Sequence, residues 1–359
     1  MVAKVRMALG STIPVIIHAG LPKTGTTYLQ QRLVDNREWL ASQGVRYPTI
    51  GQEIGPGHHN LARLFRGESV GAPWSKQTPR EVMTASTLGV KPGEQLLLSS
   101  ETFSSLHMQH AAALKDVVGS DVVYVLYLRR RSSMILSRWQ EDVKHGDSRT
   151  FAEYVSAQLL GAGDVLRPEE PITVGARTFG VQALRLIIYE ELVARRIDLF
   201  DHFVVNVLGL SLDGAIPAKE HATNTSLEAA TVEALRALNA AQCKGQLWAD
   251  GRHTYAQAAL DYLRHEADGQ ALLADVSRVF DAHAESVDLT RLDQEWLSRD
   301  REIVSACGPQ ILNGSGDELL FPASESREAR VLRPSVLHIH LPQIRFENAS
   351  RVIVANAGI

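Results

Sequence analysis

Residues 14–33 combine a short apolar run, a glycine-containing turn and an amphipathic helical pattern. The run PVIIH has the length of a buried strand, and Leu29, Leu33 and Leu40 recur at helical spacing after the turn. Where a strand leads through a tight loop into a helix, the backbone N–H groups of the first helical turn converge on one point and favour a bound anion. This stretch therefore predicts a strand, an anion-binding loop and a helix.

The rest of the sequence contains four further apolar runs with the length of a strand, and helical patterns separate most of them. These runs are Val45 to Tyr47, Gln95 to Ser99, Val122 to Leu128 and Arg185 to Tyr189. Strands that alternate with helices form a mostly parallel sheet with helices on both faces. We therefore expect a three-layer α/β fold, in which the Gly-, Pro- and Ser-rich stretch 58–91 is a long, partly helical loop region over the sheet.

The length and a change of pattern near residue 225 suggest how the chain is divided. A chain of 359 residues is long enough for about two domains, or for one large α/β domain with additions. Beyond residue 225, a capping box is followed by helical runs at 226–242, 254–266, 270–285 and 290–306. The prediction is an N-terminal tail (1–13), an α/β core (14–224), a helical extension (225–308) and a C-terminal tail without an assigned role (309–359).

The charge balance excludes a general basic surface. Lys and Arg number 37 against 41 Asp and Glu, which gives a formal net charge of −4. Such a chain has no extended positive field for wrapping nucleic acid, so we expect no nucleic-acid partner and a local anion site.

Cysteine usage and the N-terminal sequence bear on the compartment. Only Cys243 and Cys307 are present, which argues against a disulfide-built secreted scaffold and fits buried thiols in a reducing compartment. The first 20 residues lack the pattern of a secretory signal, and no window approaches the roughly 20 apolar residues of a membrane span. We therefore expect a soluble, cytoplasmic protein.

The segment from Gly20 to Thr27, GLPKTGTT, is the predicted anion-binding loop. Gly25 lets the backbone approach a ligand closely, Lys23 adds a cation, and Thr26 and Thr27 add hydroxyl donors. The segment differs from the triphosphatase loop GxxxxGK[ST], because Lys23 precedes the second glycine and Thr26 stands where that motif has lysine. The alternative is a glycine turn that only joins the strand to the helix. The expected binding residues are Lys23, Thr24, Gly25, Thr26 and Thr27.

A second candidate anion site follows the strand VVYVLYL. Arg129, Arg130 and Arg131 end this strand, and Ser137 lies near the start of the helical run after it. Arginine forms bidentate, charge-assisted hydrogen bonds with phosphate, and a hydroxyl eight residues on adds a further donor. The alternative is a solvated basic start of a helix.

Taken together, PKTGTT after one strand and Arg129 with Ser137 after another resemble the sulfotransferase family that uses 3′-phosphoadenosine 5′-phosphosulfate (PAPS). The resemblance implies a P-loop-like fold in which the first loop holds the 5′-phosphosulfate and the Arg/Ser pair holds the 3′-phosphate. The spacing of eight residues to Ser137 matches the family's second motif and favours Arg129 over its two neighbours.

Further segments are similar to the bacterial branch of this family, and they extend the resemblance from about residue 14 to residue 227. The segments are HAGLPKTGTTYLQ, QGVRYP, HHNLA, LLLSSETFS, YLRRRSSMILSRWQ, IIYEEL and TNTSL. The resemblance does not cover the helical runs after residue 227 or the tail.

The implied reaction is a metal-independent, in-line transfer of the sulfuryl group from PAPS to a hydroxyl or amine of an acceptor. Lys23 and the hydroxyls of Thr26 and Thr27 would stabilise the charge that develops on the leaving phosphate oxygen. Glu101, directly after the LLLSS strand, is the first candidate for the base that removes the acceptor's proton. Its alternative role is to cap the next helix or to pair with a nearby cation.

Histidines and a Tyr-Glu pair complete the candidate site. His58 and His59 lie in the region expected to cover the acceptor side, where either could act as a base or orient the acceptor; the alternative is that they are ordinary loop histidines. His18, at the end of the first strand, is more typical of a packed, hydrogen-bonded histidine. By resemblance Tyr189, followed by Glu190, lies near the nucleotide, and a structural strand-end role is the alternative.

Two other functions remain open from the sequence. One is a P-loop small-molecule kinase in which Glu101 lies beside a metal ion, although the lysine of the GK[ST] motif is missing. The other is a non-catalytic protein that binds a nucleotide or a sulfated glycan. For the sulfotransferase, candidate acceptors are saccharides, glycolipids and small metabolites, and the residues of stretches 48–95 and 145–180 and of the region after 227 do not identify one.

Overall fold

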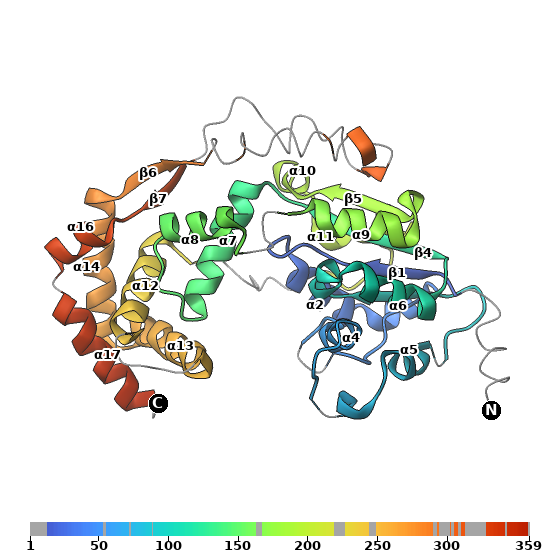
Figure 1. Cartoon of the computed structure of the whole chain (residues 1–359), viewed down its shortest axis with the longest axis horizontal. Helices are drawn as coiled ribbons and strands as arrows, with labels where there is room; N and C mark the ends of the chain where they lie inside the picture. Colours follow the sequence, from blue (N-terminus) through green and yellow to red (C-terminus); the bar gives the residue numbers. More distant parts are fainter. Residues whose placement is uncertain are drawn as a thin grey trace. The chain divides into compact units, whose positions relative to one another are not determined.

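The structure, a computed structural model, divides into two compact units (Figure 1). The first consists of residues 1–130, 167–223 and 296–323, and the second of residues 131–166, 224–295 and 324–359. The structure describes residues 13–52, 55–71, 73–87, 89–162, 167–218, 227–243, 249–289, 293, 302, 305–307, 310–312, 328–341 and 343–357.

A five-stranded parallel sheet with the order β2-β3-β1-β4-β5 forms the centre of the first unit. Its strands are β1 (Val15–His18), β2 (Val45–Arg46), β3 (Gln95–Ser99), β4 (Val122–Leu128) and β5 (Leu184–Ile188). The helices of this unit are α2 (Thr26–Asp35), α3 (Arg37–Ser42), α4 (His59–Phe65), α5 (Pro79–Thr87), α6 (Met108–Val118), α9 (Glu169–Phe179), α10 (Tyr189–Ala194) and α11 (Leu199–His202). Short 3-10 or π turns are at Trp74–Lys76, Glu101–Ser105, Val181–Ala183 and Phe203–Val207.

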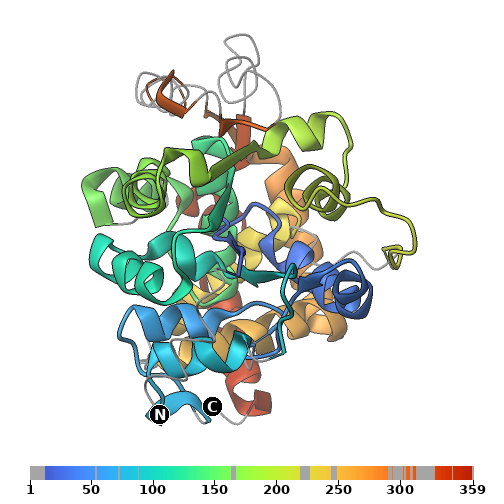
Figure 2. The same ribbon diagram turned by 90° about the vertical axis from the view of Figure 1, so that its right-hand side faces the viewer.

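Alternate residues of the strands point to opposite faces of this sheet and build two separate apolar layers. In β1, Val15 and Ile17 pack with residues of α4, α5, α6 and α9 on one face. Ile16 packs with residues of α2, α3, α10 and α11 on the other face. Because both faces are covered, the strands are apolar throughout rather than alternating with polar residues. The helical layers on either side of the sheet are visible in Figures 1 and 2.

The second unit is mainly helical and has its own apolar core. Its elements are α7 (Arg131–Lys144), α8 (Phe151–Ala157), a π turn (Gln158–Ala162), α12 (Ala229–Cys243), α13 (Ala249–His265), α14 (Ala267–His283), β6 (Glu285–Asp288), β7 (Glu328–Val331), α16 (Pro334–His340) and α17 (Gln343–Ala357). Strands β6 and β7 pair in antiparallel fashion. Helix α8 begins with a capping box, in which the Thr150 side chain accepts from the Glu153 backbone N–H and Glu153 bonds back to Thr150.

The structure confirms the predicted α/β fold with a mostly parallel sheet, flanking helices and additional C-terminal helices. The runs 95–99 and 122–128 coincide with β3 and β4, whereas the fifth strand ends at Ile188, so that Tyr189 begins α10. The stretch 58–91 is more helical than its composition suggests, because it contains α4 and α5. The predicted helix at 290–306 and the TNTSL segment lie largely outside the described residues.

The two units differ from the segments 14–224 and 225–308 that the sequence suggests. Residues 131–166 group with the C-terminal helices rather than with the sheet. The physical reason is the apolar face of α7, where Ile135, Trp139 and Val143 belong to the core of the second unit.

The register of the sheet determines which segments meet. His18, the last residue of β1, pairs with Ser99 of β3 and with Val125 of β4. The segments that follow these parallel strands therefore leave the sheet at the same edge, which is where open α/β folds bind ligands.

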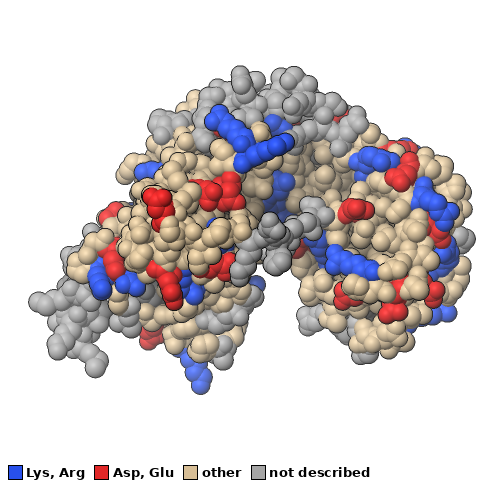
Figure 3. All heavy atoms as spheres, turned by 180° about the vertical axis from the view of Figure 1, so that it is seen from behind, with Lys and Arg blue, Asp and Glu red and all other residues tan. Residues whose placement is uncertain are grey.

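The exposed charges are mixed. Figure 3 shows Lys and Arg side chains interspersed with Asp and Glu on the face that it presents, in keeping with the net charge of −4. Within the described part of the chain, no helix has both the length and the apolar character that crossing a bilayer requires.

Candidate functional site

The loop between β1 and α2 has an unusual backbone conformation. Lys23 has a φ of 66°, a left-handed value that residues other than glycine rarely adopt, and Gly25 has a φ of 76°. Gly25 is also the N-cap of α2, and no side chain caps this helix end. A loop with left-handed residues turns successive N–H groups to one side and forms a concave anion-binding surface, to which the helix start adds its own N–H groups.

Gly25 has little space for any other residue. A Cβ atom at this position would lie 2.8 Å from Leu199 Cδ2 of α11 and 3.7 Å from Tyr189 Cε2 of α10. The close approach places Tyr189 beside the loop. Two of the residues predicted to bind the nucleotide, Gly25 and Tyr189, are therefore neighbours.

The three threonines of the loop have different surroundings. Thr24 is buried and its hydroxyl donates to the Leu21 carbonyl at 2.7 Å, which stabilises the loop from within. Thr26 is also buried, and its hydroxyl donates to Glu101 Oε2 at 3.1 Å. Thr27 is exposed. Of the three threonines, Thr27 is therefore the exposed one.

Arg129 lies against the loop. Its guanidinium donates a hydrogen bond to the Lys23 carbonyl, and Cζ lies 5.2 Å from the centre of the Tyr189 ring. Arg129 is partly exposed, whereas Arg130 is buried. The structure thus brings Arg129, Tyr189 and Lys23 together.

Glu190 supports this arrangement from below the surface. Its Oε1 accepts the backbone N–H of Arg130 at 2.9 Å. Burial raises the pKa of the Glu190 carboxyl, an effect opposed by that hydrogen bond and by the nearby charge of Arg129. Glu190 therefore fixes the backbone next to Arg129, which agrees with the structural alternative for this acid.

Three consecutive residues at the end of β3 each contact a different neighbour. Ser99 Oγ is 2.7 Å from His18 Nδ1, and Ser100 Oγ is 2.9 Å from His59 Nδ1. Glu101 accepts the hydrogen bond from Thr26. The strand end therefore links the candidate base and His59 to the predicted anion-binding loop.

His58 and His59 have opposite environments although they are adjacent in sequence. His58 is buried, its Nδ1 accepts the Ser99 N–H at 3.0 Å, and its Nε2 is 2.9 Å from the Pro48 carbonyl, to which it donates. Burial lowers the pKa of His58 to about 4. With both nitrogens engaged, His58 is a structural residue, and the expectation that it could serve as a base is corrected.

His59 is half-buried at the start of α4 and close to Glu101. Burial lowers the pKa of His59, and the negative charge of Glu101 acts in the opposite direction. His18, in contrast, is fully buried, and desolvation lowers its pKa to about 3. His18 is therefore a packed residue, as its position suggested, and His59 remains the histidine candidate.

Ser137 lies on α7 and belongs to the second unit, whereas Arg129 belongs to the first unit. The pairing of Ser137 with Arg129 stays a prediction. The sequence analysis missed Ser100, whose Oγ accepts the Thr102 N–H as an N-cap in addition to contacting His59. A serine directly before an acidic residue at a strand end is the capping signal that could have identified it.

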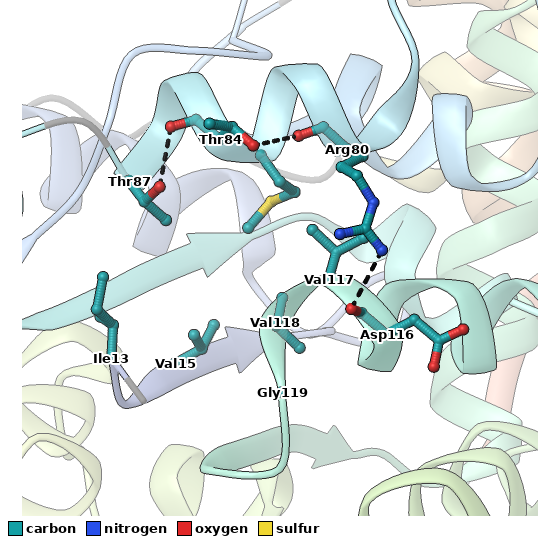
Figure 4. Close-up of a pocket in the computed structure, with 10 residues that line it drawn as sticks. Ile13, Val15, Arg80, Thr84, Thr87, Asp116, Val117, Val118 and Gly119 are labelled. Carbon is teal, nitrogen blue, oxygen red and sulfur yellow. Dashed lines mark hydrogen bonds between the residues drawn. The ribbon is translucent and has the colours of Figure 1, made fainter. Parts of the chain in front are cut away.

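A separate cavity of about 210 Å³ lies at the other end of β1 (Figure 4). Val15, the first residue of β1, lines it together with Met83 of α5 and Val117 of α6. Arg80 extends toward Asp116, and its guanidinium lies 3.5 Å from the main-chain oxygen of that residue. The cavity does not include the loop, Glu101 or Arg129.

Among the residues that the structure describes, no three His, Cys, Asp or Glu side chains are arranged to hold a metal ion. No protein-family model matches the chain, and no curated protein matches it. Among solved structures, the chain is similar to a sulfotransferase from Alicyclobacillus acidocaldarius. The two chains are 14% identical, the match covers 67% of this chain and 98% of that one, and the TM-score is 0.41.

Proposed function

We propose that the protein transfers the sulfuryl group of PAPS to a hydroxyl or amine of an acceptor molecule. The observation that carries the proposal is the hydrogen bond of 3.1 Å from Thr26 to Glu101, because it puts a carboxylate next to the anion-binding loop. Transfer from an anionic donor requires a base close to the site that binds the donor. The motif resemblance of the loop and of Arg129 supports PAPS as the donor.

In this proposal the donor's two anionic ends bind to neighbouring groups. The N–H groups of the loop, the Lys23 side chain and the Thr27 hydroxyl hold the 5′-phosphosulfate. Arg129, positioned over the Tyr189 ring, binds the 3′-phosphate. Arginine suits this role because its planar guanidinium bonds phosphate in a bidentate manner.

The transfer step is an in-line displacement at sulfur. Glu101 takes the proton of the acceptor group, and the acceptor oxygen or nitrogen forms a bond to sulfur. The bond between sulfur and the bridging phosphate oxygen breaks, and its electron pair stays on the 5′-phosphate of the product 3′-phosphoadenosine 5′-phosphate (PAP). Lys23 and the loop N–H groups stabilise the charge that develops on that oxygen.

His59 is proposed to orient the acceptor rather than to remove its proton. Its Nδ1 faces the Ser100 hydroxyl, whose oxygen also accepts the Thr102 N–H. When that hydroxyl donates to Nδ1, the ring proton is on Nε2, which is then a donor to the acceptor's oxygen.

The test is an assay of the purified protein with PAPS and a panel of saccharides, glycolipids and small hydroxylated metabolites. Mass spectrometry should detect a sulfated product and an equal amount of PAP. Lys23→Ala and Glu101→Gln should each reduce turnover by about 10² to 10⁴-fold. The matched controls Lys91→Ala and Glu38→Gln, at exposed positions on other elements, should retain it.

Two results would contradict the proposal. If neither Lys23→Ala nor Glu101→Gln changes turnover, the assigned residues are wrong. Tight binding of PAP without transfer to any acceptor in the panel would instead indicate a nucleotide-binding protein without catalytic activity.

One observation also favours a second candidate, a metal-dependent phosphotransferase. Glu101 follows β3, which is a direct neighbour of β1, and its carboxylate contacts a hydroxyl of the loop. A carboxylate beside a phosphate-binding loop is suited to holding Mg²⁺ with few protein ligands. This candidate predicts ATP turnover that a chelator abolishes, whereas sulfuryl transfer should continue in the presence of the chelator.

A further inference from the structure

The contact between Thr26 and Glu101 has a consequence for the order in which the site is used. Thr26 is the first residue of α2 and is buried, and its hydroxyl lies 3.1 Å from Glu101 Oε2. An ionised carboxylate only accepts hydrogen bonds, so the hydroxyl must be the donor in this contact.

A hydroxyl has one proton and therefore donates to one acceptor at a time. While Thr26 donates to Glu101, it cannot donate to an anion in the loop. An anion in the loop and the carboxylate of Glu101 therefore compete for the same proton. The anion also brings a second negative charge close to the carboxylate, which disfavours the existing contact.

The Thr26 hydroxyl can change partner while the methyl group of the side chain keeps its place. The methyl packs closely against Gly20, because a Cβ on Gly20 would be 2.5 Å from Thr26 Cγ2. The hydroxyl proton rotates about the Cβ–Oγ bond, so it can turn from one acceptor to another without a change of χ1.

We propose that the Thr26 hydroxyl is a donor-dependent switch on Glu101. With the loop empty, Thr26 holds the Glu101 carboxylate against the loop. When the nucleotide binds, Thr26 donates to its 5′-phosphate group instead and releases Glu101 for the proton of the acceptor. The inference rests on the proposed function, and it makes Thr26 a positioning residue for Glu101 and predicts that the nucleotide binds before the acceptor.

A double-mutant cycle on PAP affinity tests the switch without relying on turnover. The dissociation constant of PAP is measured by calorimetry for the wild type, Glu101→Met, Thr26→Val and the double variant. Thr26→Val keeps the shape of the side chain, and Glu101→Met keeps its length but has no acceptor. Thr26→Ser, which keeps the hydroxyl, is the matched control, and circular dichroism verifies that each variant is folded.

The switch predicts that Glu101→Met strengthens PAP binding more when residue 26 is Thr than when it is Val. The factor by which Glu101→Met strengthens PAP binding should be about five times larger in the wild-type background than in the Thr26→Val background, which corresponds to the contribution of one hydrogen bond. Thr26→Ser should behave like the wild type in the same comparison.

The possible failures are distinguishable. Equal factors in the two backgrounds would show that the charge of Glu101 acts on the nucleotide without the Thr26 hydroxyl, and the switch would be excluded while PAP binding still supported the proposed function. Absence of PAP binding to the folded wild type would overturn both proposals.

Discussion

The guanidinium of Arg129 donates a hydrogen bond to the main-chain carbonyl of Lys23 and lies over the ring of Tyr189. The side chain at the end of β4 thereby fixes the backbone of the loop that follows β1. Arg129 can thus support the left-handed conformation of Lys23 in addition to its proposed role in binding an anion.

Arg129→Lys should weaken PAP binding by about tenfold, even though the charge is kept, because lysine has neither the planar fork nor the same stacking on tyrosine. Arg37→Lys is the matched control. Arg37 also donates to a main-chain carbonyl, that of Tyr47, and lies over the Tyr47 ring, but away from the loop. PAP affinity measured by calorimetry should be unchanged in the control, and equal losses in both variants would contradict the assignment.

Gly25→Ala should lower the free energy of unfolding and abolish PAP binding. The residue has a φ of 76°, and the new Cβ would lie 2.8 Å from Leu199 Cδ2. Gly93→Ala is the control, because Gly93 has a φ of 88° and no atom within 4 Å of the added Cβ. The control should lose about 1–2 kcal/mol in chemical unfolding, the cost of the left-handed backbone alone. If Gly25→Ala loses no more unfolding free energy than this control and keeps its PAP affinity, the loop has room for a Cβ atom at position 25.

The buried His58 should make stability depend on pH. Its pKa is lowered from 6.5 to about 4 in the folded state, with burial as the main cause and Arg37 and His59 as nearby positive charges. The unfolded state therefore binds more protons between these pH values, and the free energy of unfolding should fall as the pH decreases from about 6.5 to about 4, by about 3 kcal/mol at the lower limit. His58→Gln should reduce this slope, as measured by urea unfolding at several pH values. If the dependence of unfolding free energy on pH is the same in His58→Gln, titratable groups other than His58 cause the loss of stability.

In the second unit, Glu233 and Arg236 form a buried ion pair at 2.7 Å, with side chains 3% and 5% exposed. Glu233→Ala should cost about 3–5 kcal/mol of unfolding free energy, because it leaves the Arg236 charge buried without this partner. Glu285→Ala is the control. It removes the pair with Arg333, whose side chains are 47% and 66% exposed, and should cost less than about 1 kcal/mol. Similar costs for the two variants would contradict the importance of burial.

The sheet could be predicted from the sequence because its strands are covered on both faces. The runs 95–99 and 122–128 are almost continuously apolar, and such runs indicate buried parallel strands whatever their neighbours are. The tail is harder to interpret from the sequence, because Pro334 interrupts its short β-branched runs and a proline usually breaks a regular element. Pro334 instead begins α16, at the one helical position where proline is favourable.

The loop motif indicates part of the candidate site, but the contacts within this site depend on tertiary register. Thr26 and Glu101 are 75 residues apart and meet because β1 and β3 pair with His18 opposite Ser99. The difference between His58 and His59 has the same origin. Adjacent histidines carry no local signal of which one is buried, and the position of α4 against the end of β3 decides it.

Each unit consists of three separate stretches of the chain, and the stretches of the two units alternate. During synthesis, the ribosome therefore begins the second unit before the first is complete, and residues 296–323 of the first unit emerge after most of the second. Neither unit corresponds to a continuous segment that could be excised. Until residues 224–295 have emerged, the apolar face of α7 has only α8 among the earlier elements of its unit to pack against, so the nascent chain exposes apolar surface to which a chaperone can bind.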